Sequence, residues 1–176
     1  MECNKKFSFT AEETLKYIQS LYEKKMVTYP RVDTTFLPND MYPKIEGILM
    51  EMEPYANFTA PLLGKPIRKS KKVFDDDKIT DHHAIIPTGV RPSGLPVEQK
   101  RVYDLIARRF IAAFYPDCIV SNTTVMGIVT THEFKATGKV ILEEGWRVLY
   151  PKKESDKDTE NDAEQEQIMP NFIKGE

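Results

Sequence analysis

The sequence of 176 residues is poor in several features that define common protein classes. It has only 2 cysteines, Cys3 and Cys118, and their spacing fits neither a disulfide framework nor a zinc site. Such scarcity is typical of proteins from a reducing compartment. No apolar run approaches the roughly 18 residues of a membrane span, and the polar stretch 1–10 does not resemble a signal peptide. We therefore expect a globular, cytoplasmic protein with no membrane partner.

Charge of one sign is not in large excess either, because 25 Lys and Arg residues stand against 27 Asp and Glu residues, a net charge of −2. Taken alone, this balance argues against a nucleic-acid partner. The distribution is uneven, however: residues 152–176 hold 4 basic and 8 acidic groups, which leaves residues 1–151 with a net charge of +2. Five cations lie close together, namely Lys65, Arg68, Lys69, Lys71 and Lys72. This run is either a solvated loop or an arm that contacts phosphates.

Three segments have the apolar spacing of amphipathic helices. They are expected at about residues 10–24, 38–54 and 96–115. The first opens at Thr10, which is followed three positions later by Glu13, the spacing of a capping box. Proline, glycine and charged residues predict loops over 60–80 and 87–96.

Beyond residue 116 the pattern changes to the two-residue period of β-strands. Short β-prone stretches around four apolar residues alternate with glycines, which predicts the start of an antiparallel sheet. The apolar residues are Val125, Phe134, Val140 and Val148, and the glycines are Gly127, Gly138 and Gly145. Residues 152–167 are charged and nearly free of apolar groups, which predicts a disordered acidic loop. The expected fold class is α+β, with a helix-rich domain over 1–115 and a partial antiparallel β segment over 116–176.

The segment 28–33, Thr-Tyr-Pro-Arg-Val-Asp, is the most informative for chemistry. A residue before proline is extended, and residues two apart in an extended chain share a face, so Tyr29 and Arg31 should point the same way. A phenol has a pKa of about 10 and becomes a good nucleophile when a nearby cation favours the phenolate. The guanidinium of Arg31 would do this, or would hold a phosphate for the phenol of Tyr29 to attack. The alternative is that Tyr29 is a packing residue, which is the commonest use of tyrosine.

Two of the 3 histidines, His82 and His83, are adjacent. Adjacent side chains diverge, and no cysteine or histidine at ligand spacing completes a site, so we expect no metal in this chain. A histidine that faces a phosphate oxygen, as hydrogen-bond donor or proton shuttle, needs no third ligand and suits tyrosine–phosphate chemistry better. A structural role is the alternative for whichever of the two points away. The Asp-x-Asp-x-Glu pattern at 156–160 is rejected as a magnesium site, because chance produces it in so acidic a run.

Together, these segments resemble the type IA DNA topoisomerases, and among them most closely the bacterial topoisomerase III branch. The resemblance runs over nearly the whole chain. It is carried by the entry to the tyrosine-bearing domain at 2–15, the active-site signature at 28–34, the histidine motif at 80–88, and the stretches 102–116, 138–139 and 145–146. Where many relatives read Arg-Thr-Asp, this chain has Arg31-Val32-Asp33, a change on the alternate face that should not touch catalysis.

The resemblance implies a reaction and a role for each candidate residue. Tyr29 would attack a phosphodiester of single-stranded DNA and form a 5′-phosphotyrosine link, which frees a 3′-hydroxyl and lets the strand be rejoined without ATP. Arg31 would position the scissile phosphate, and His82 would contact it or assist proton movement. His83 and the cations of the 65–72 run are the further candidates for phosphate contacts. The parent protein would be a nucleoid-associated bacterial enzyme that relaxes or decatenates DNA by strand passage.

The resemblance also implies that parts of the enzyme are missing from this sequence. In this family, Mg²⁺ is bound by an acidic cluster in a Toprim domain that precedes the tyrosine domain, and no such cluster precedes residue 1. We therefore expect a fragment, the tyrosine domain over 1–115 plus part of the β gate domain, whose partners are single-stranded DNA and the Toprim and gate domains of the same polypeptide. Alone, the fragment is expected to be inactive.

Two other functions are compatible with the residues. One is a non-catalytic module that binds single-stranded nucleic acid with the 65–72 run and aromatic faces. The other is an interaction domain with no nucleic-acid role. A tyrosine recombinase is disfavoured, because its tyrosine would lie near the C-terminus among several separated Arg and His residues, whereas Tyr29 lies near the beginning.

Overall fold

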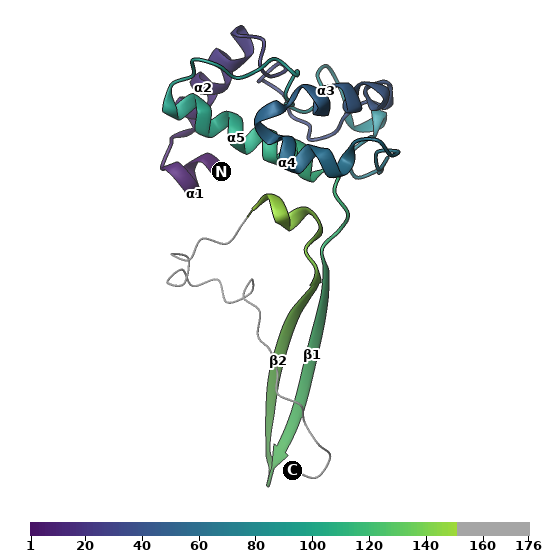
Figure 1. Cartoon of the computed structure of the whole chain (residues 1–176). Coiled ribbons are helices and arrows are strands. Elements are labelled where there is room, and N and C mark those ends of the chain that lie inside the picture. The colour runs from purple at the N-terminus through teal and green to yellow at the C-terminus, as the bar shows by residue number, and fades with distance from the viewer. Residues whose placement is uncertain (151–176) are drawn as a thin grey trace. The chain divides into compact units, whose positions relative to one another are not determined.

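The computed structural model describes residues 1–150, apart from the side chain of Val129. The chain falls into two compact units, of which the first is Met1–Tyr115 and the second begins at Pro116. The loop expected at 152–167 lies outside the described residues, as does the C-terminal part of the expected β segment. Helices in the first unit and an antiparallel pair of strands in the second confirm the α+β class (Figure 1).

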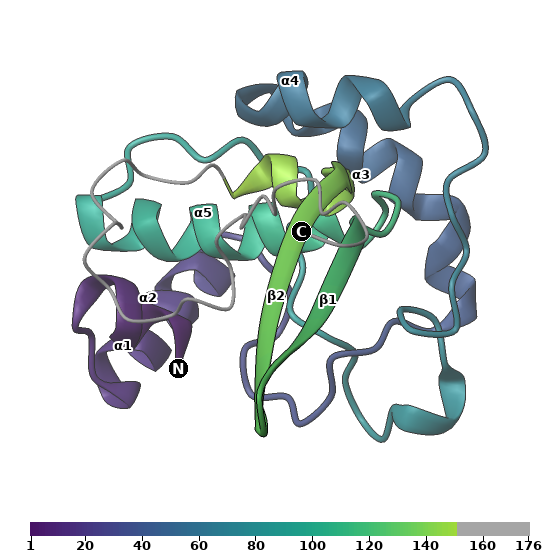
Figure 2. The same ribbon diagram turned by 90° about the horizontal axis from the view of Figure 1, so that it is seen from below.

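The first unit is helical, and short 3₁₀ helices join its longer elements (Figures 1 and 2). Its α-helices are α1 (Glu2–Phe7), α2 (Ala11–Glu23), α3 (Ile45–Glu51), α4 (Ala56–Thr59) and α5 (Val97–Ala112). Its 3₁₀ helices are η1 (Asn39–Lys44), η2 (Glu53–Tyr55), η3 (Ala60–Leu62) and η4 (Asp76–Lys78). Helices α2 and α5 pack against each other. None of the helices in the described part of the chain is long and apolar enough to cross a membrane.

The first predicted helix begins where its capping residues indicate. The hydroxyl of Thr10 accepts a hydrogen bond from the Glu13 N–H at 3.1 Å, and the Glu13 carboxylate accepts one from the Thr10 N–H at 2.8 Å. This reciprocal pair is a capping box, and it confirms the start of α2. The bond from the Thr10 N–H, and a second one that the Thr10 hydroxyl donates to the same carboxylate at 2.9 Å, hold the pKa of the Glu13 carboxyl below its usual value. The third predicted helix is confirmed as α5.

The second predicted helix is correct only in its later part. Residues 39–44 form the 3₁₀ helix η1, and α-helical geometry begins at Ile45. Pro43 accounts for the difference, because it has no N–H to donate and its ring crowds the preceding turn of an α-helix. Helices α1 and α4 were not predicted. They have 6 and 4 residues, too few for an apolar period to be recognised.

The core of the first unit is formed by aliphatic side chains from three helices. Leu21 of α2, Ile45 and Leu49 of α3, and Ile111 of α5 have no exposed surface, and Val102 of α5 is 1% exposed. Burial of a side chain of this size stabilises the folded state by about 1.5–3 kcal/mol relative to an exposed position. These contacts fix the helices from which the intervening loops extend.

The second unit contains one long hairpin of β1 (Ile119–Val129) and β2 (His132–Glu143), which pair antiparallel. The prediction that Gly127 and Gly138 separate short strands is wrong, because both lie inside the strands. Gly127 stands opposite Phe134, and an aromatic residue across from a glycine covers the backbone that the glycine leaves bare. A two-stranded ribbon with exposed faces therefore tolerates glycine where a packed sheet would not.

The predicted strand around Val148 is also wrong, because that residue lies in the 3₁₀ helix η5 (Gly145–Leu149). Gly145 is required there by its conformation and its surroundings. Its φ is +53°, and a Cβ at this position would lie 2.5 Å from the carbonyl oxygen of Pro116. The same carbonyl accepts a hydrogen bond from the Trp146 N–H at 3.0 Å, which ties the start of η5 to the start of the second unit.

Candidate active site

The segment that carries Tyr29 follows α2 and is held to the segment that follows the two adjacent histidines. Val27 and Pro87 form an isolated antiparallel bridge. On one side of it the Thr28 N–H donates to the Ile86 carbonyl at 3.0 Å, and on the other the Thr88 N–H donates to the Met26 carbonyl at 3.2 Å. Neither bond needs an N–H from Pro87, which is why proline is tolerated in the bridge. The backbone that leads into Tyr29 is therefore fixed.

The far end of the same segment is held as well. The Ala84 N–H donates to the Phe36 carbonyl at 2.9 Å. Leu37 donates its N–H to the Val73 carbonyl at 2.8 Å and accepts from the Asp75 N–H at 3.1 Å. Residues 26–37, here called the tyrosine loop, are thus bonded to chain segments on both sides although they contain no helix or strand.

The tyrosine loop brings Tyr29 against His82. The centroids of the two rings are 4.4 Å apart and the ring planes are inclined by 42°. Tyr22, from the last turn of α2, meets the ring of Tyr29 edge-on at a centroid distance of 5.5 Å. Tyr29 is half-buried between these neighbours, whereas His82 is exposed. The structure therefore places an exposed imidazole next to a half-buried phenol.

Arg31 is exposed and lies two residues beyond Tyr29. Within residues 1–150, no ion pair or hydrogen bond to another side chain occupies its guanidinium. A free guanidinium has a planar fork of donors that matches two oxygens of a phosphate. That Tyr29 and Arg31 point the same way stays a prediction.

His83 has a different environment from that of His82. It is half-buried, and its Nδ1 lies 2.8 Å from the carbonyl oxygen of Ala84. Because a carbonyl oxygen only accepts, Nδ1 carries the proton and Nε2 is the remaining nitrogen for other contacts. A neutral His83 therefore presents an acceptor at Nε2, and it donates to a phosphate oxygen from there only as the imidazolium.

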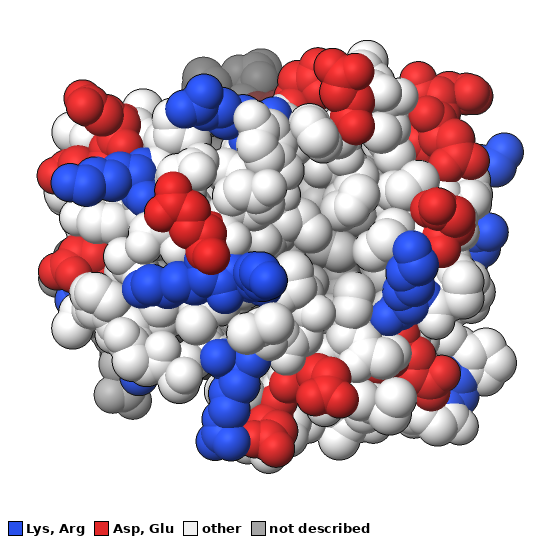
Figure 3. Space-filling model, turned by 90° about the horizontal axis from the view of Figure 1, so that it is seen from above, with Lys and Arg blue, Asp and Glu red and all other residues white. Residues whose placement is uncertain are grey.

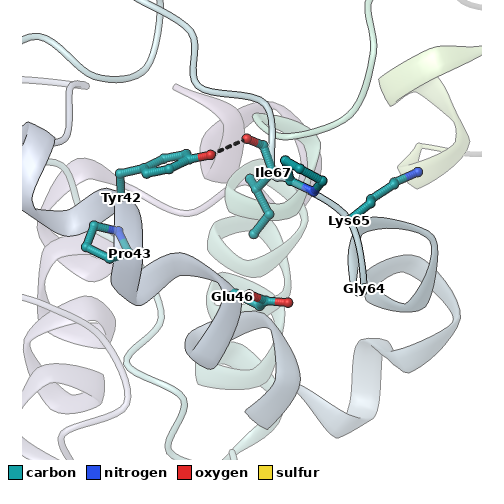
Figure 4. A pocket seen from close by; sticks show the side chains of 7 residues that line it. Tyr42, Pro43, Glu46, Gly64, Lys65 and Ile67 are labelled. Carbon is teal, nitrogen blue, oxygen red and sulfur yellow. Dashed lines mark hydrogen bonds between the residues drawn. The ribbon is translucent and has the colours of Figure 1, made fainter.

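The five cations of the 65–72 run are all exposed. Tyr42 of η1 contacts this segment: its hydroxyl donates to the Ile67 carbonyl at 2.7 Å, and the Lys69 ammonium lies 5.2 Å from the centre of its ring. An open hollow of about 360 Å³ lies beside them (Figure 4). Its lining consists of Tyr42, Pro43, Glu46, Gly64, Lys65, Pro66 and Ile67. The hollow therefore takes in one cation of the run, and it includes neither Tyr29 nor His82.

Cations and acids alternate around one face of the molecule, with a central area of uncharged side chains (Figure 3). The carboxylate of Asp76 accepts hydrogen bonds from the side chain and backbone of Asn39, at 2.7 and 2.8 Å. These bonds, the side-chain one first, hold the pKa of the Asp76 carboxyl below its usual value, with a smaller contribution from Lys69. At least one acid, Asp76, therefore lies close to a cation of the 65–72 run, Lys69.

Comparison with known proteins gives one consistent result. A family model described as DNA topoisomerase matches residues 1–176. The DNA topoisomerase 3 of Bacillus licheniformis is 38% identical over 99% of this chain, and that of Bacillus subtilis is also 38% identical over 99%. The Bacillus cereus protein of the same name is 38% identical over 99% of the chain. The chain belongs to the type IA DNA topoisomerase family. It covers 24% of the first two relatives and 25% of the third.

Type IA topoisomerases are expected to use Mg²⁺, so we tested whether the residues present fit a metal. The described residues contain no group of three or more His, Cys, Asp or Glu side chains placed to hold a metal ion. The ring of Tyr29 contacts the rings of Tyr22 and His82, whereas Mg²⁺ prefers carboxylate and carbonyl oxygen ligands. Residues 1–150 therefore do not fit a magnesium site, and no step of the chemistry is assigned to a metal held by them.

Sequence reasoning missed two residues of the candidate site, Thr28 and Tyr22. Thr28 was read only as part of the motif, yet its hydroxyl bonds to residues 56 and 58 positions away. Tyr22 lies within the first predicted helix, and its contact with the ring of Tyr29 is seen only in the structure. A tyrosine at the last turn of a helix that leads into the motif was the one available signal.

Proposed function

We propose that this chain carries the nucleophile with which a type IA topoisomerase cleaves one strand of DNA. The Oη of Tyr29 attacks the phosphorus of a phosphodiester in single-stranded DNA, and the bond from phosphorus to the 3′ oxygen breaks. The tyrosine loses its proton and the 3′ oxygen gains one. The products are a 5′-phosphotyrosine link and a free 3′-hydroxyl, and the reverse attack by that hydroxyl rejoins the strand without ATP.

Two residues assist in this proposal. Arg31 binds the non-bridging oxygens of the scissile phosphate and stabilises the charge that develops on them in the transition state. His82, next to the ring of Tyr29, donates a hydrogen bond to the phosphate or carries the transferred proton. His83 and Lys65, Arg68, Lys69, Lys71 and Lys72 make further phosphate contacts along the strand.

The observation that carries the proposal is the contact between the rings of Tyr29 and His82 at 4.4 Å. The two motifs are far apart in the sequence, and a packing tyrosine needs no exposed imidazole beside it. The backbone bonds on both sides of the tyrosine loop further support this function, because nucleophilic attack requires a fixed position of the attacking atom.

The proposal for the whole protein includes parts that this chain does not supply. A Toprim domain in the same polypeptide binds Mg²⁺, and the remaining gate domains let the tyrosine-bearing domain swing away so that another strand passes through the break. The chain alone is then inactive in relaxation and decatenation. The whole protein acts at the nucleoid in the bacterial cytoplasm.

The test is the formation of a covalent DNA–protein adduct. The chain is mixed with a Toprim-bearing segment of a DNA topoisomerase 3, Mg²⁺ and a labelled single-stranded oligonucleotide, and the adduct is separated under denaturing conditions and mapped by mass spectrometry. We expect the label on Tyr29 and its loss in Tyr29→Phe. Tyr17→Phe removes one hydroxyl from the middle of α2 and should leave the yield unchanged.

The alternatives give different results in the same experiment. Salt-dependent binding of the oligonucleotide with no adduct under any complementation would contradict the catalytic role and favour a single-stranded nucleic-acid-binding module. Absence of any salt-dependent binding would favour an interaction domain. An adduct that persists in Tyr29→Phe would assign the nucleophile to another residue.

A further inference from the structure

Thr28 lies immediately before Tyr29 and makes three hydrogen bonds to the segment that follows His82. Its backbone N–H donates to the Ile86 carbonyl at 3.0 Å. Its hydroxyl donates to the Ala84 carbonyl at 3.2 Å and accepts from the Ile86 N–H at 2.9 Å. One short side chain therefore satisfies a donor and an acceptor on a segment that is remote in sequence.

The hydroxyl of Thr28 takes the place of a backbone group. In a regular antiparallel ladder, two paired residues exchange both N–H···O=C bonds, so the Ile86 N–H would bond to the Thr28 carbonyl. Here that N–H bonds to the hydroxyl instead. The last hydrogen bond of the ladder is thus made by a side chain. Beyond it, at Tyr29 and Pro30, the backbone is no longer paired with this segment. Ile86 is 4% exposed and Ala84 is half-buried, so their N–H and carbonyl would be costly to leave unpaired.

Residues 26–28 and 86–88 form the junction between the two segments, and the end of it that lies away from Tyr29 is held independently. The Thr88 N–H donates to the Met26 carbonyl at 3.2 Å, and the Thr88 hydroxyl donates to the Lys25 carbonyl. These bonds lie on the far side of the Val27–Pro87 bridge from Tyr29. Loss of the Thr28 hydroxyl would therefore leave the two segments joined by these bonds and by the Thr28 N–H. It would remove both side-chain hydrogen bonds at the end from which Tyr29 and His82 extend.

We propose that Thr28 is a positioning residue, whose hydroxyl holds the segment after His82 at the spacing where the rings of Tyr29 and His82 meet. This rests on the proposed function, in which these two residues take part in cleavage. Thr28 does not touch the reacting atoms and acts through its neighbours. The side chain that suits this role has a hydroxyl and a small apolar body, because it is half-buried and bonds in both directions.

The experiment compares three variants of the 176-residue chain. Thr28→Val keeps the shape and removes the hydroxyl, Thr28→Ser keeps the hydroxyl, and Thr88→Val removes a hydroxyl from the other end of the same junction. The readout is the nuclear Overhauser effect between the ring protons of Tyr29 and His82, together with the His82 ring chemical shifts. Circular dichroism establishes that each variant is folded. Adduct formation with the Toprim-bearing segment and Mg²⁺ is measured in parallel.

We expect Thr28→Val to lose the ring-to-ring signal while Thr28→Ser and Thr88→Val retain it. The rate of adduct formation should fall about 100-fold in Thr28→Val, the size of effect that a misplaced reacting group has, and should change little in the other two variants. A ring-to-ring signal of full intensity in Thr28→Val would overturn the proposal, and so would an equal loss in Thr88→Val or Thr28→Ser.

The ring contact is measured without catalysis, so the two proposals fail separately. If the wild-type chain forms no adduct, the proposed function is contradicted, and the spectra of the three variants still decide the role of Thr28. If Thr28→Val unfolds, the comparison of Thr28→Ser with the wild type gives the result, because serine keeps both hydrogen bonds and loses only a methyl group. Loss of the ring contact in a folded Thr28→Ser would then overturn the proposal.

Discussion

The tyrosine loop and the cationic run at 65–72 are both irregular segments of the first unit, yet they are held in different ways. The tyrosine loop is bonded to remote segments at both ends, and the ring of Tyr29 lies between Tyr22 and His82. The cations of the 65–72 run extend from the surface, where Lys69 lies over Tyr42 and acids are close by. The two segments thus differ in how firmly their functional groups are placed.

In the proposed function, this difference matches two kinds of work on DNA. Breaking a bond requires reacting atoms within a few tenths of an ångström of their proper place, which only a fixed backbone provides. Attraction of a charged strand acts over about 8–10 Å at ordinary salt and tolerates movement of the side chains. We therefore expect substitutions in the tyrosine loop to change the rate of cleavage, and substitutions in the cationic run to change binding and its salt dependence.

Removal of the guanidinium of Arg31 should have the largest effect. Arg31→Ala should slow adduct formation by about 10²–10³-fold at saturating DNA, because a donor to the transition-state charge is lost. Arg31→Lys should recover only part of the rate, since an ammonium does not reproduce a two-pronged grip on phosphate. Arg91→Ala is the control, because Arg91 is exposed and pairs with Glu53. An unchanged rate in Arg31→Ala would remove this residue from the mechanism.

Loss of the imidazole next to Tyr29 should be the next largest effect. His82→Ala should slow single-turnover cleavage by about 10²-fold, as removal of an acid–base group does. His83→Ala should have a smaller effect, because its Nδ1 is engaged with the Ala84 carbonyl. The control is His132→Ala, at the exposed end of β2. Equal rates in the His82 and His132 variants would break the proposed distinction between a fixed catalytic group and a surface histidine.

Substitutions in the cationic run should change the affinity for DNA and not the rate of cleavage. Replacement of Lys65, Lys71 and Lys72 by glutamine should reduce the slope of log affinity against log salt by about 2, if each lysine contacts one phosphate of a single strand. Cleavage at saturating DNA should not change. A second triple variant at other exposed lysines, Lys5, Lys16 and Lys100, provides the control. If both triple variants have the same slope, the run is a solvated loop and not a phosphate-binding arm.

The stability of the packed unit that supports the tyrosine loop should depend on pH above neutrality. Burial raises the pKa of the Tyr103 hydroxyl to about 12, against about 10 in an unfolded chain. The folded state then holds this proton more tightly, so the stabilisation is fully present below pH ~10 and is lost as the pH rises toward ~12. Urea unfolding at pH 8, 10 and 11 should show a decline that is smaller in Tyr103→Phe. A decline of the same size in Tyr103→Phe would show that this hydroxyl does not cause it.

Local sequence signals predicted the longest helices well. Thr10 and Glu13 are three positions apart, and their reciprocal hydrogen bonds form within one turn, so the start of α2 needed no knowledge of the rest of the chain. The apolar period of α5 was equally plain. The prediction was wrong at proline and glycine positions, because each of these residue types occurs in more than one kind of structure. Pro43 was placed inside an α-helix but lies in a 3₁₀ helix, and Gly127 was taken as a break between strands but lies within β1.

The candidate residues could be named from the sequence, but the contacts between them could not. Tyr29, Arg31 and His82 stand in motifs that can be found along the chain, and their roles stay predictions. No periodicity links residues 28, 84 and 86, so the hydroxyl junction at Thr28 had no sequence signal. A threonine before a tyrosine is ordinary until the partner of its hydroxyl is known.

The sequence by itself determined the longest helices, the α+β class, the type IA topoisomerase family and the residues on which a mechanism is proposed. Those properties depend on local periods, caps and short motifs, which are written in neighbouring positions. Only the tertiary structure decided that His82 lies against Tyr29, that Thr28 ends the ladder between their segments, and that the cationic run stays at the surface. These depend on hydrogen bonds and packing between remote segments, which form only when burial of the core has brought those segments together.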